Sequence, residues 1–470
     1  MKPSFQLFNS EKQKVLPIEK KPGDTILMYT CGPTVYNFAH IGNFRTYVFE
    51  DVLRRALKYF GYHVKQAMNL TDVDDKTIKG AIANHQTLDE FTKPFKEAFF
   101  QDLKTLNIEP VEVYPAATDH IQEMIDMIQV LLDKEIAYVG VDGSVYFSIK
   151  KFPEYGRLAH LETKELKVGA SNRIQSDEYE KDAVSDFVLW KAYDPERDGK
   201  IFWQSPFGKG RPGWHIECSA MAIKHLGKTL DIHVGGIDNL FPHHENEIAQ
   251  SEACTGCCFA KHWCHSEHLL VDGKKMSKSL GNFYTLRDLL NKGFTGKEVR
   301  MALLQSHYRM QLNFSISSLE SARSSLKRID ACISQLITLE PKEKDHYQHS
   351  HFYQIQNAFD QAIADDLNLA QALAVLFGCI KDIQHNILEN EIGLNDKKEF
   401  LQLLDKFNQV LGIMTFDTQQ IPEEIIKAAE QRKIARQSKN YQESDRLRKW
   451  IEDQGYAIDD SPTGTKIRKL

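Results

Sequence analysis

Two short segments of the chain carry residue types suited to binding a polyphosphate. His40-Ile41-Gly42-Asn43 lies where a predicted loop enters a helix, and a helix N-terminus offers N–H groups and partial positive charge to a phosphate. Gly42 allows a ligand to approach the backbone closely. His40 can donate a hydrogen bond to charge that develops on a transferring phosphoryl group, and the amide of Asn43 can donate as well. A capped helix with an incidental histidine is the alternative interpretation of so short a motif.

The second segment is a lysine loop, Lys275-Met276-Ser277-Lys278-Ser279, which follows a predicted turn at Asp272-Gly273. Lysines on a mobile loop can neutralise a triphosphate when the loop closes, which favours the transition state over the ground state. A solvated lysine loop is the ordinary fate of such a run. The two segments together predict a nucleotide site far more specifically than either one does alone.

Cysteine, histidine and glutamate suggest a metal site. His243 and Glu247 are spaced i and i+4, so they share one face of a predicted helix, about 5–6 Å apart at Cβ. With Cys31 and Cys218 they form a set of the kind that binds zinc. A rival set has the C-x-x-C spacing of a zinc knuckle and comprises Cys254, Cys257, Cys258, Cys264 and either His262 or His265. The C-x-x-C spacing is the stronger local signal, and the residues by themselves leave both sets open.

Length and composition limit the classes of protein to which the chain can belong. Its 470 residues suffice for two to four domains, and 42% hydrophobic with 26% charged residues is the balance of an ordinary globular chain. No apolar run approaches the roughly 18–20 residues of a membrane span, and the N-terminus lacks the apolar core of a secretory signal. Eight cysteines are too few for a disulfide scaffold. We therefore expect a cytoplasmic protein with no membrane contact.

The elements that would position these residues follow from hydrophobic periodicity. Residues 25–29 predict a strand that continues to Cys31, residues 44–60 a helix, and residues 64–70 a second strand, which makes a β-α-β unit. Further strands are predicted at 230–234 and 268–271, and a helix begins at Phe241-Pro242 and runs to about 253. The C-terminal third is predicted to be helical over 316–339, 352–388 and 396–412, followed by two helices and a short extended tail.

The predicted fold is therefore α/β: a Rossmann-like, doubly wound parallel sheet with an inserted connective subdomain, then an α-helical bundle and a small C-terminal domain. The predicted boundaries are 1–120 for the first half of the sheet domain, 121–205 for the insertion, 206–272 for the second half, 273–320 for the region with the lysine loop, 321–415 for the bundle and 416–470 for the small domain. Net charge is −6, but from Lys427 to Leu470 there are 11 Lys/Arg and 7 Asp/Glu. A local basic face can bind a polyanion, although a solvated helical hairpin is the simpler interpretation.

Longer segments carry a family resemblance. Met68–Lys76, Gly213–Met221 and Phe241–Glu252 resemble cysteinyl-tRNA synthetase, and the two phosphate-binding segments match the HIGH-type and KMSKS signatures of class I aminoacyl-tRNA synthetases. Asn43 departs from the HIGH-type pattern, which has histidine there. In that family the residues matching Cys31, Cys218, His243 and Glu247 hold one zinc ion at the amino-acid site. The resemblance thus favours this dispersed set over the C-x-x-C set.

The resemblance also implies a reaction and a role for individual residues. ATP and L-cysteine would give cysteinyl-adenylate, and the acyl group would pass to the 3′-terminal ribose of tRNA(Cys), with Mg²⁺ on the triphosphate. The implied site residues are, for catalysis on the phosphates, His40, Asn43, Lys275 and Lys278; for ATP also Gly42, Gly235, Gly236 and Asp238; for cysteine Cys31, Thr71 and Trp214; and for tRNA in the small anticodon-binding domain Arg436, Arg448 and Asp460.

Zinc explains how cysteine would be told from serine. A hydrophobic pocket rejects a small hydroxyl group only weakly, whereas a thiolate is a far better zinc ligand than an alcohol. Two other functions fit parts of the sequence: a cysteine ligase that passes activated cysteine to a small amine, and a non-catalytic paralogue that binds RNA or metal. The helical, basic C-terminus argues against the first, and the complete set of site residues argues against the second. A monomer is expected from the family.

Overall fold

The computed structural model describes residues 2–161, 186–277, 280–416, 422–438, 440–461 and 464–469. The chain forms two compact units, Met1–Met414 and Thr415–Leu470, and each is described by itself. Lys278 of the lysine loop lies outside the described residues, as does the side chain of Asp460. All other residues predicted for the ATP, cysteine and metal sites lie in the described part of unit 1.

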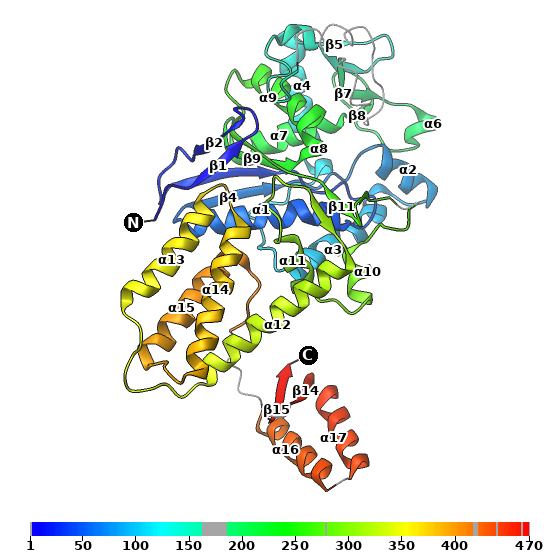
Figure 1. The fold of residues 1–470 in the computed structure, drawn as a ribbon. Helices are drawn as coiled ribbons and strands as arrows, with labels where there is room; N and C mark the ends of the chain where they lie inside the picture. Colours follow the sequence, from blue (N-terminus) through cyan, green and yellow to red (C-terminus); the bar gives the residue numbers. More distant parts are fainter. Residues whose placement is uncertain are drawn as a thin grey trace. The chain divides into compact units, whose positions relative to one another are not determined.

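The core of unit 1 is a parallel sheet of four strands in the order β10-β9-β3-β4 (Figure 1). Its strands are β3 (Thr25–Thr30), β4 (His63–Met68), β9 (Leu230–Gly236) and β10 (Ala260–Ser266). The strand order reverses between β3 and β9, which come from different halves of the sheet. Ligands of doubly wound sheets bind beyond the carboxyl ends of the strands at such a switch point. The predicted doubly wound fold is confirmed.

Helices cover both sides of this sheet. α1 (Ile41–Tyr59) connects β3 to β4 and lies on one side, whereas α7 (Trp214–Leu226) and α9 (Glu245–Thr255) lie on the other (Figure 1). The apolar residues of α1 recur with helical period, and Gly61 follows its C-cap at φ +92°, a backbone conformation that glycine adopts without strain. The remaining elements of the first half are β1 (Gln6–Asn9), β2 (Lys14–Pro17), α2 (Asp75–Ala83) and α3 (Leu88–Thr105).

A small antiparallel sheet, in the order β5-β6-β7-β8, stands between the two halves of the parallel sheet in the sequence. It comprises β5 (Ala137–Val139), β6 (Val145–Phe147), β7 (Phe187–Ala192) and β8 (Gly210–Pro212), with α4 (Ile121–Asp133) before it, the single turns η1 (Ala117–His120) and η2 (Ile149–Lys151), and α6 (Pro195–Asp198). Trp190 and Phe187 of β7 are fully buried in one apolar cluster with Ile216 of α7. Through this packing the inserted sheet contacts α7, the helix that contains Cys218.

The helix predicted from Phe241-Pro242 has an irregular first turn. α8 (Ile237–Asn239) leads into a wide turn, η3 (Leu240–His244), in which Phe241 is extended (φ −137°, ψ 132°) and the Phe241–Pro242 peptide is cis; regular helix starts at Glu245. Phe241 interrupts the helix, and helical backbone resumes at Pro242, which lies near the start of the helix as predicted. The irregular turn before Glu245 was not predicted.

Beyond β10, a three-stranded sheet in the order β12-β11-β13 carries the start of the lysine loop. Its elements are β11 (Leu269–Val271), β12 (Lys274–Lys275) and β13 (Leu312–Phe314), and α10 (Leu286–Asn291) and α11 (Gly296–Leu303) lie between β12 and β13 in the sequence. The predicted turn at Asp272-Gly273 connects β11 to β12, with φ +50° and +73°. The lysine loop thus leaves the end of a two-stranded hairpin.

Four helices form the bundle that ends unit 1: α12 (Ile316–Thr338), α13 (His349–Ala364), α14 (Leu369–Leu388) and α15 (Leu394–Leu411). The single helix predicted over 352–388 is two helices. Asp366 and Leu367 both have φ +53°, and the side chain of Asn368 accepts a hydrogen bond from Gln371 N at 3.1 Å as the cap of α14. The periodicity continued across the break, so pattern alone did not detect it.

The described residues of unit 2 contain the two predicted helices, and the predicted extended tail is a β-hairpin. α16 (Glu423–Gln437) packs against α17 (Tyr441–Asp453), and β14 (Tyr456–Ser461) pairs antiparallel with β15 (Gly464–Lys469). Ile425, Leu447, Ile451 and Ile458 are buried together between these elements. The unit therefore has a small core of its own.

Candidate functional site

His40 and Asn43 cap the first turn of α1 with each other. The backbone N–H of Asn43 donates to His40 Nδ1 at 3.3 Å, and the backbone N–H of His40 donates to Asn43 Oδ1 at 3.1 Å. This reciprocal arrangement is a capping box. It uses the asparagine that replaced the expected histidine, because an amide oxygen accepts from a backbone N–H at this position.

The cap also sets the protonation of His40. Because Nδ1 accepts a hydrogen bond, the proton of the neutral ring lies on Nε2. Burial lowers the pKa of His40 from 6.5 to about 4. The ring is therefore neutral at pH 7, and it can act on a phosphate as a hydrogen-bond donor rather than as a cation.

The segment that follows the lysine loop lies beside the start of α1. Ile41 N donates to Tyr284 O at 3.0 Å, and the rings of His40 and Phe283 lie 5.2 Å apart. A Cβ atom added at Gly42 would lie 3.2 Å from the terminal methyl carbon of Met276, so the loop also reaches the glycine of the HIGH-type segment. Lys275 is exposed on β12. The tertiary structure thus brings together the two segments that were predicted to bind phosphates and that are far apart in the sequence.

Cys31, Cys218, His243 and Glu247 form a compact buried cluster. One ligand atom from each lies within 4.8 Å of those of the other three, and His243 Nε2 is 3.0 Å from Glu247 Oε1. Cys31 follows β3, Cys218 comes from α7, and the other two come from η3 and α9. The four exposed fractions range from 0% to 7%. All four predicted metal-ligating residues are therefore together, at the carboxyl end of β3.

The pKa shifts in this cluster reflect ionisable groups that are buried and lie close to one another. Burial raises the pKa of the Cys31 thiol, and the pKa of the Cys218 thiol is raised by its hydrogen bond with Cys31 and by burial. Burial disfavours a charged His243, but Cys218 and Glu247 outweigh it and raise its pKa to about 10. A divalent cation among these groups would favour the thiolates and the neutral imidazole, so the donor set fits a soft metal ion.

A second set shares two members with the first. Cys31 and Glu247 are also within reach of His233 and His244. His244 Nε2 lies 3.2 Å from Cys31 Sγ, and His233 Nε2 lies 2.9 Å from Glu247 Oε2. The sequence analysis missed both histidines. A possible signal was the position of His233 near the end of a predicted buried strand, where a polar residue is unusual.

The rival C-x-x-C set does not come together. Among the described residues, which include all six of its members, the groups of potential ligands that converge both contain Cys31 and Glu247. Cys257 is exposed and its thiol points to Thr255 O, while Cys264 is buried and its thiol points to Phe8 O. Each of these two thiols therefore faces a backbone carbonyl and not another member of the C-x-x-C set.

Thr71 and Trp214, predicted to hold cysteine, border the cluster. The indole of Trp214 stacks on the His243 ring with centroids 4.3 Å apart. Thr71 Oγ1 donates to Glu217 Oε2 at 2.9 Å and accepts from Asn69 Nδ2 at 3.1 Å. Burial raises the pKa of Glu217 well above 4.5. Glu217 and Asn69, which the sequence analysis did not single out, thus fix the hydroxyl of Thr71.

Of the residues predicted for adenosine, Gly235 and Gly236 end β9 and Asp238 follows in α8. A Cβ atom at Gly235 would lie 2.7 Å from His244 Cε1, so the approach of this ring to the strand requires glycine. Asp238 is exposed, 3.3 Å from His268 Nδ1. In unit 2, Arg448 is exposed and pairs with Glu452 at 3.1 Å, and Arg436 is exposed. None of the helices in the described part of the chain has the length and apolarity of a membrane span.

Two family models match parts of the chain. Residues 17–324 match the family model of the class I tRNA synthetase (C) catalytic domain, and residues 358–415 match that of the DALR domain. The chain is 55% identical to the cysteine–tRNA ligase of Protochlamydia amoebophila (strain UWE25), covering 99% of this chain and 98% of that protein, and 54% identical to that of Chlamydia felis (strain Fe/C-56), covering 95% and 94%.

Solved structures extend the comparison to the fold. The Mycobacterium tuberculosis methionyl-tRNA synthetase bound by methionyl-adenylate is similar with a TM-score of 0.58 at 12% identity, covering 83% of this chain and 90% of that chain. At that identity the likeness concerns the fold alone. The matched catalytic and DALR domains, together with the identity to cysteine–tRNA ligases over nearly their whole length, show that the chain belongs to the cysteine–tRNA ligase family.

Proposed function

We propose that this protein attaches L-cysteine to tRNA(Cys) and selects cysteine through a zinc ion held by Cys31, Cys218, His243 and Glu247. The ligase activity is that of the family to which the chain belongs. The observation that carries the proposed selectivity is the convergence of four potential ligands from three parts of the chain. When bound, zinc supplies a soft Lewis acid that prefers a substrate thiolate to the hydroxyl of serine.

We favour the set with Cys218 over the set with His233 and His244. Two thiolates make the softer donor set, which suits zinc. His233 then donates to the second oxygen of Glu247 and fixes its orientation, as groups that support metal ligands commonly do. His244 lies against Gly235, and its Nδ1 shares a hydrogen bond with His265 Nε2 at 2.8 Å. We propose that His244 separates the metal set from the end of β9 and is not itself a ligand.

For the phosphates we propose a division of roles. The start of α1 and the neutral His40 donate hydrogen bonds to the α- and β-phosphates, with Gly42 allowing close approach. Lys275 and Lys278 neutralise the triphosphate with Mg²⁺, and Gly235, Gly236 and Asp238 border the adenosine. No protein nucleophile is needed, since the substrate carboxylate attacks the α-phosphate and pyrophosphate leaves; catalysis is positioning and charge stabilisation.

The experiment combines metal analysis with two activity assays on the purified chain. We expect about one zinc per chain, as a single four-ligand site requires, with cysteine-dependent ATP–pyrophosphate exchange and charging of tRNA(Cys). X-ray absorption at the zinc edge should show an added sulfur ligand when cysteine is present and no change with serine. If the enzyme were active but its zinc spectrum did not change when cysteine was added, the proposed selection of cysteine by zinc would be contradicted.

The same assays separate the two other functions considered. A ligase for a small amine would show exchange without charging of tRNA, and a non-catalytic paralogue would show neither. The identity to cysteine–tRNA ligases and the matched DALR domain support tRNA as the acceptor. We propose that Arg436, Arg448 and Asp460 of unit 2 contact this tRNA. We propose a cytoplasmic monomer, and sedimentation of the purified chain tests its oligomeric state.

A further inference from the structure

The loop between β3 and α1 exposes two aromatic rings. Tyr36 is 39% exposed and Phe38 is 38% exposed, although both lie only a few residues before His40. Large aromatic side chains bury much apolar area, so two of them exposed within one short loop need an explanation. Their place in the sequence puts them at the edge of the proposed nucleotide site.

Each ring is accompanied by a cation from another element. Lys76 Nζ of α2 lies 5.1 Å from the centroid of Tyr36, and the guanidinium carbon of Arg287 of α10 lies 4.7 Å from that of Phe38. These distances are those of cation–π pairs. We call Tyr36, Phe38, Lys76 and Arg287 the aromatic–cation surface.

The Phe38 half of this surface is held rigidly. Arg287 Nη1 lies 2.7 Å from Asp102 Oδ2, and Nη2 donates to Ala98 O at 3.2 Å. Phe38 packs edge-on against Phe95, with centroids 5.3 Å apart. The ring and the guanidinium therefore keep their positions without a ligand. Stacking of a planar group there would cost little conformational entropy of these two side chains.

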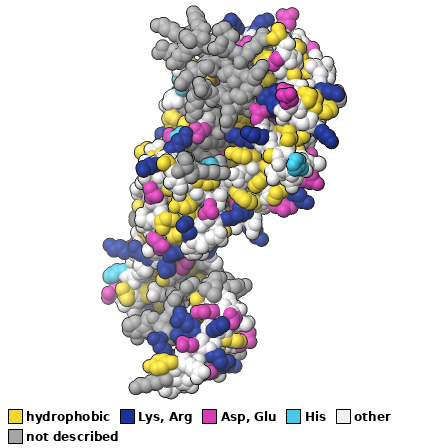
Figure 2. All heavy atoms as spheres, turned by 90° about the vertical axis from the view of Figure 1, so that its right-hand side faces the viewer, with side chains coloured by type: hydrophobic (Ala, Val, Ile, Leu, Met, Phe, Trp, Pro, Cys, Tyr) yellow, Lys and Arg dark blue, Asp and Glu magenta, His cyan; other side chains and the backbone are white. Residues whose placement is uncertain are grey.

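The surface adjoins the start of α1 and the chain that follows the lysine loop. Tyr36 and Phe38 lead into His40, and Arg287 follows Tyr284, whose carbonyl accepts from Ile41 N. Figure 2 looks onto the side of unit 1 on which α2 and α10 lie in Figure 1, and hydrophobic side chains alternate there with Lys and Arg side chains. With the phosphates bound at the start of α1, as proposed above, an acceptor of the activated cysteine would approach this surface.

We propose that the aromatic–cation surface binds the unpaired 3′ nucleotides of tRNA, an inference that rests on the proposed function. Bases of single-stranded nucleic acids stack on exposed aromatic rings, and nearby Lys and Arg side chains attract their phosphates. Two rings with two cations match successive nucleotides, whereas ATP has a single base. Tyr36 and Phe38 thus guide the 3′ end toward the adenylate and take no part in forming it.

The test uses Tyr36→Ala, Phe38→Ala and the double variant in the full chain. Affinity for intact tRNA(Cys) should fall between about fivefold and a hundredfold for each stacked base lost. For tRNA trimmed of its unpaired 3′ nucleotides, variants and wild type should bind equally. Cysteine-dependent ATP–pyrophosphate exchange should stay within twofold of wild type. Tyr36→Trp should restore the affinity for intact tRNA, because tryptophan offers a ring for stacking.

Phe100→Ala is the matched control, since Phe100 is 41% exposed on α3 and packs edge-on with Tyr114. It should leave binding of both tRNA forms unchanged. Three results would overturn the inference: variants that bind intact tRNA as wild type does, a loss that persists with trimmed tRNA, or a raised KM for ATP in exchange, which would assign the rings to ATP. A wild-type enzyme that charges no tRNA would instead contradict the proposed function.

Discussion

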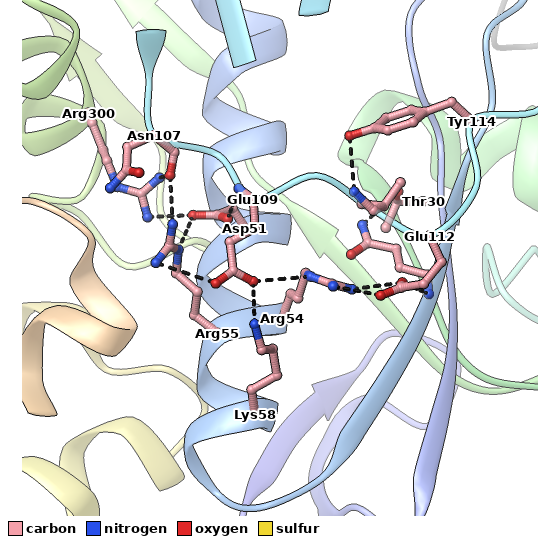
Figure 3. Close-up of polar contacts among 12 residues, drawn as sticks. Thr30, Asp51, Arg54, Arg55, Lys58, Asn107, Glu109, Glu112, Tyr114 and Arg300 are labelled. Atoms are coloured by element: carbon pink, nitrogen blue, oxygen red, sulfur yellow. Dashed lines mark hydrogen bonds and ion pairs between the residues drawn. The ribbon is translucent and has the colours of Figure 1, made fainter. Parts of the chain in front are cut away.

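Arg300 of α11 and Asp51 of α1 form an ion pair that is completely buried, with Arg300 Nη2 2.5 Å from Asp51 Oδ2 (Figure 3). The other nitrogens of Arg300 donate to Leu411 O at the end of α15 and to the carbonyls of Leu106 and Asn107. Asp51 also accepts from Arg55 and from Glu109 N. One guanidinium thus connects α1, whose N-cap is His40, to α11 and to the end of α15.

Replacing Arg300 by methionine should destabilise unit 1 strongly. Asp51 would lose its closest cation and remain buried, and breaking a buried pair in this way costs about 3–5 kcal/mol. Arg55→Met, which removes the other, partly exposed cation from Asp51, should cost about 1 kcal/mol, closer to the value of exposed pairs. Denaturant unfolding of both variants, followed by circular dichroism, measures the difference. Equal losses of stability would show that the buried geometry of Arg300 is not special.

Asn43→Ala should weaken the first turn of α1. It removes the acceptor of the His40 N–H, and loss of a capping interaction typically costs about 1 kcal/mol. Hydrogen exchange of the amides in the first turn of α1 should become faster, and exchange of ATP with pyrophosphate should slow because the phosphate-binding N–H groups are less ordered. Asn43→Asp keeps an acceptor oxygen and should preserve the protection. Unchanged amide protection in Asn43→Ala would mean that the cap does not hold the turn.

His40 should remain neutral well below pH 6.5. Burial lowers its pKa to about 4, so the folded protein favours the neutral ring. Its contribution to stability is therefore complete above the ordinary pKa of 6.5 and is lost as the pH falls through about 4, since the unfolded chain takes up the proton first. Nitrogen NMR of histidine-labelled protein, with His40→Gln to assign the signal, should show a proton on Nε2 at pH 6. A His40 signal that titrates near pH 6.5 would contradict this.

Cys218→Ser should lose zinc, while Cys257→Ser should keep it. Cys218 lies in the converging set, and Cys257 belongs to the C-x-x-C segment whose members do not converge. The expected metal content is about one ion per chain for wild type and Cys257→Ser, as a four-ligand site implies, and far less for Cys218→Ser. Atomic emission after dialysis measures it. The opposite pattern would assign the metal to the C-x-x-C segment.

Glu217→Ala should raise the KM for cysteine more than that for ATP. Glu217 accepts from Thr71 Oγ1 at 2.9 Å, and without it the hydroxyl can turn away from the metal set. We expect a loss of about tenfold in kcat/KM for cysteine, the lower end of the effect of supporting groups at metal sites. Thr71→Val should show a similar loss, and the double variant little more than either single one. Fully additive losses would mean that Glu217 acts independently of Thr71.

Local patterns in the sequence determined much of this protein. The hydrophobic periodicity of residues 44–60 and of the strands on either side predicted the first β-α-β unit. It could do so because side-chain periodicity indicates which face of an element is buried. The same patterns failed at residues 365–368, where the apolar period runs through a break. Family resemblance, rather than spacing, chose the dispersed metal set over the C-x-x-C segment.

The tertiary structure alone decided which distant groups meet. Cys31, Cys218 and Glu247 converge only because strand order reverses between β3 and β9 and brings the ends of separate β-α units to one edge. The contacts of His233 and His244 with the metal set, the Thr71–Glu217 pair and the Arg300–Asp51 pair could not be predicted from the sequence pattern. Such contacts join residues separated by tens to hundreds of positions, and no periodicity of a single helix or strand contains that information.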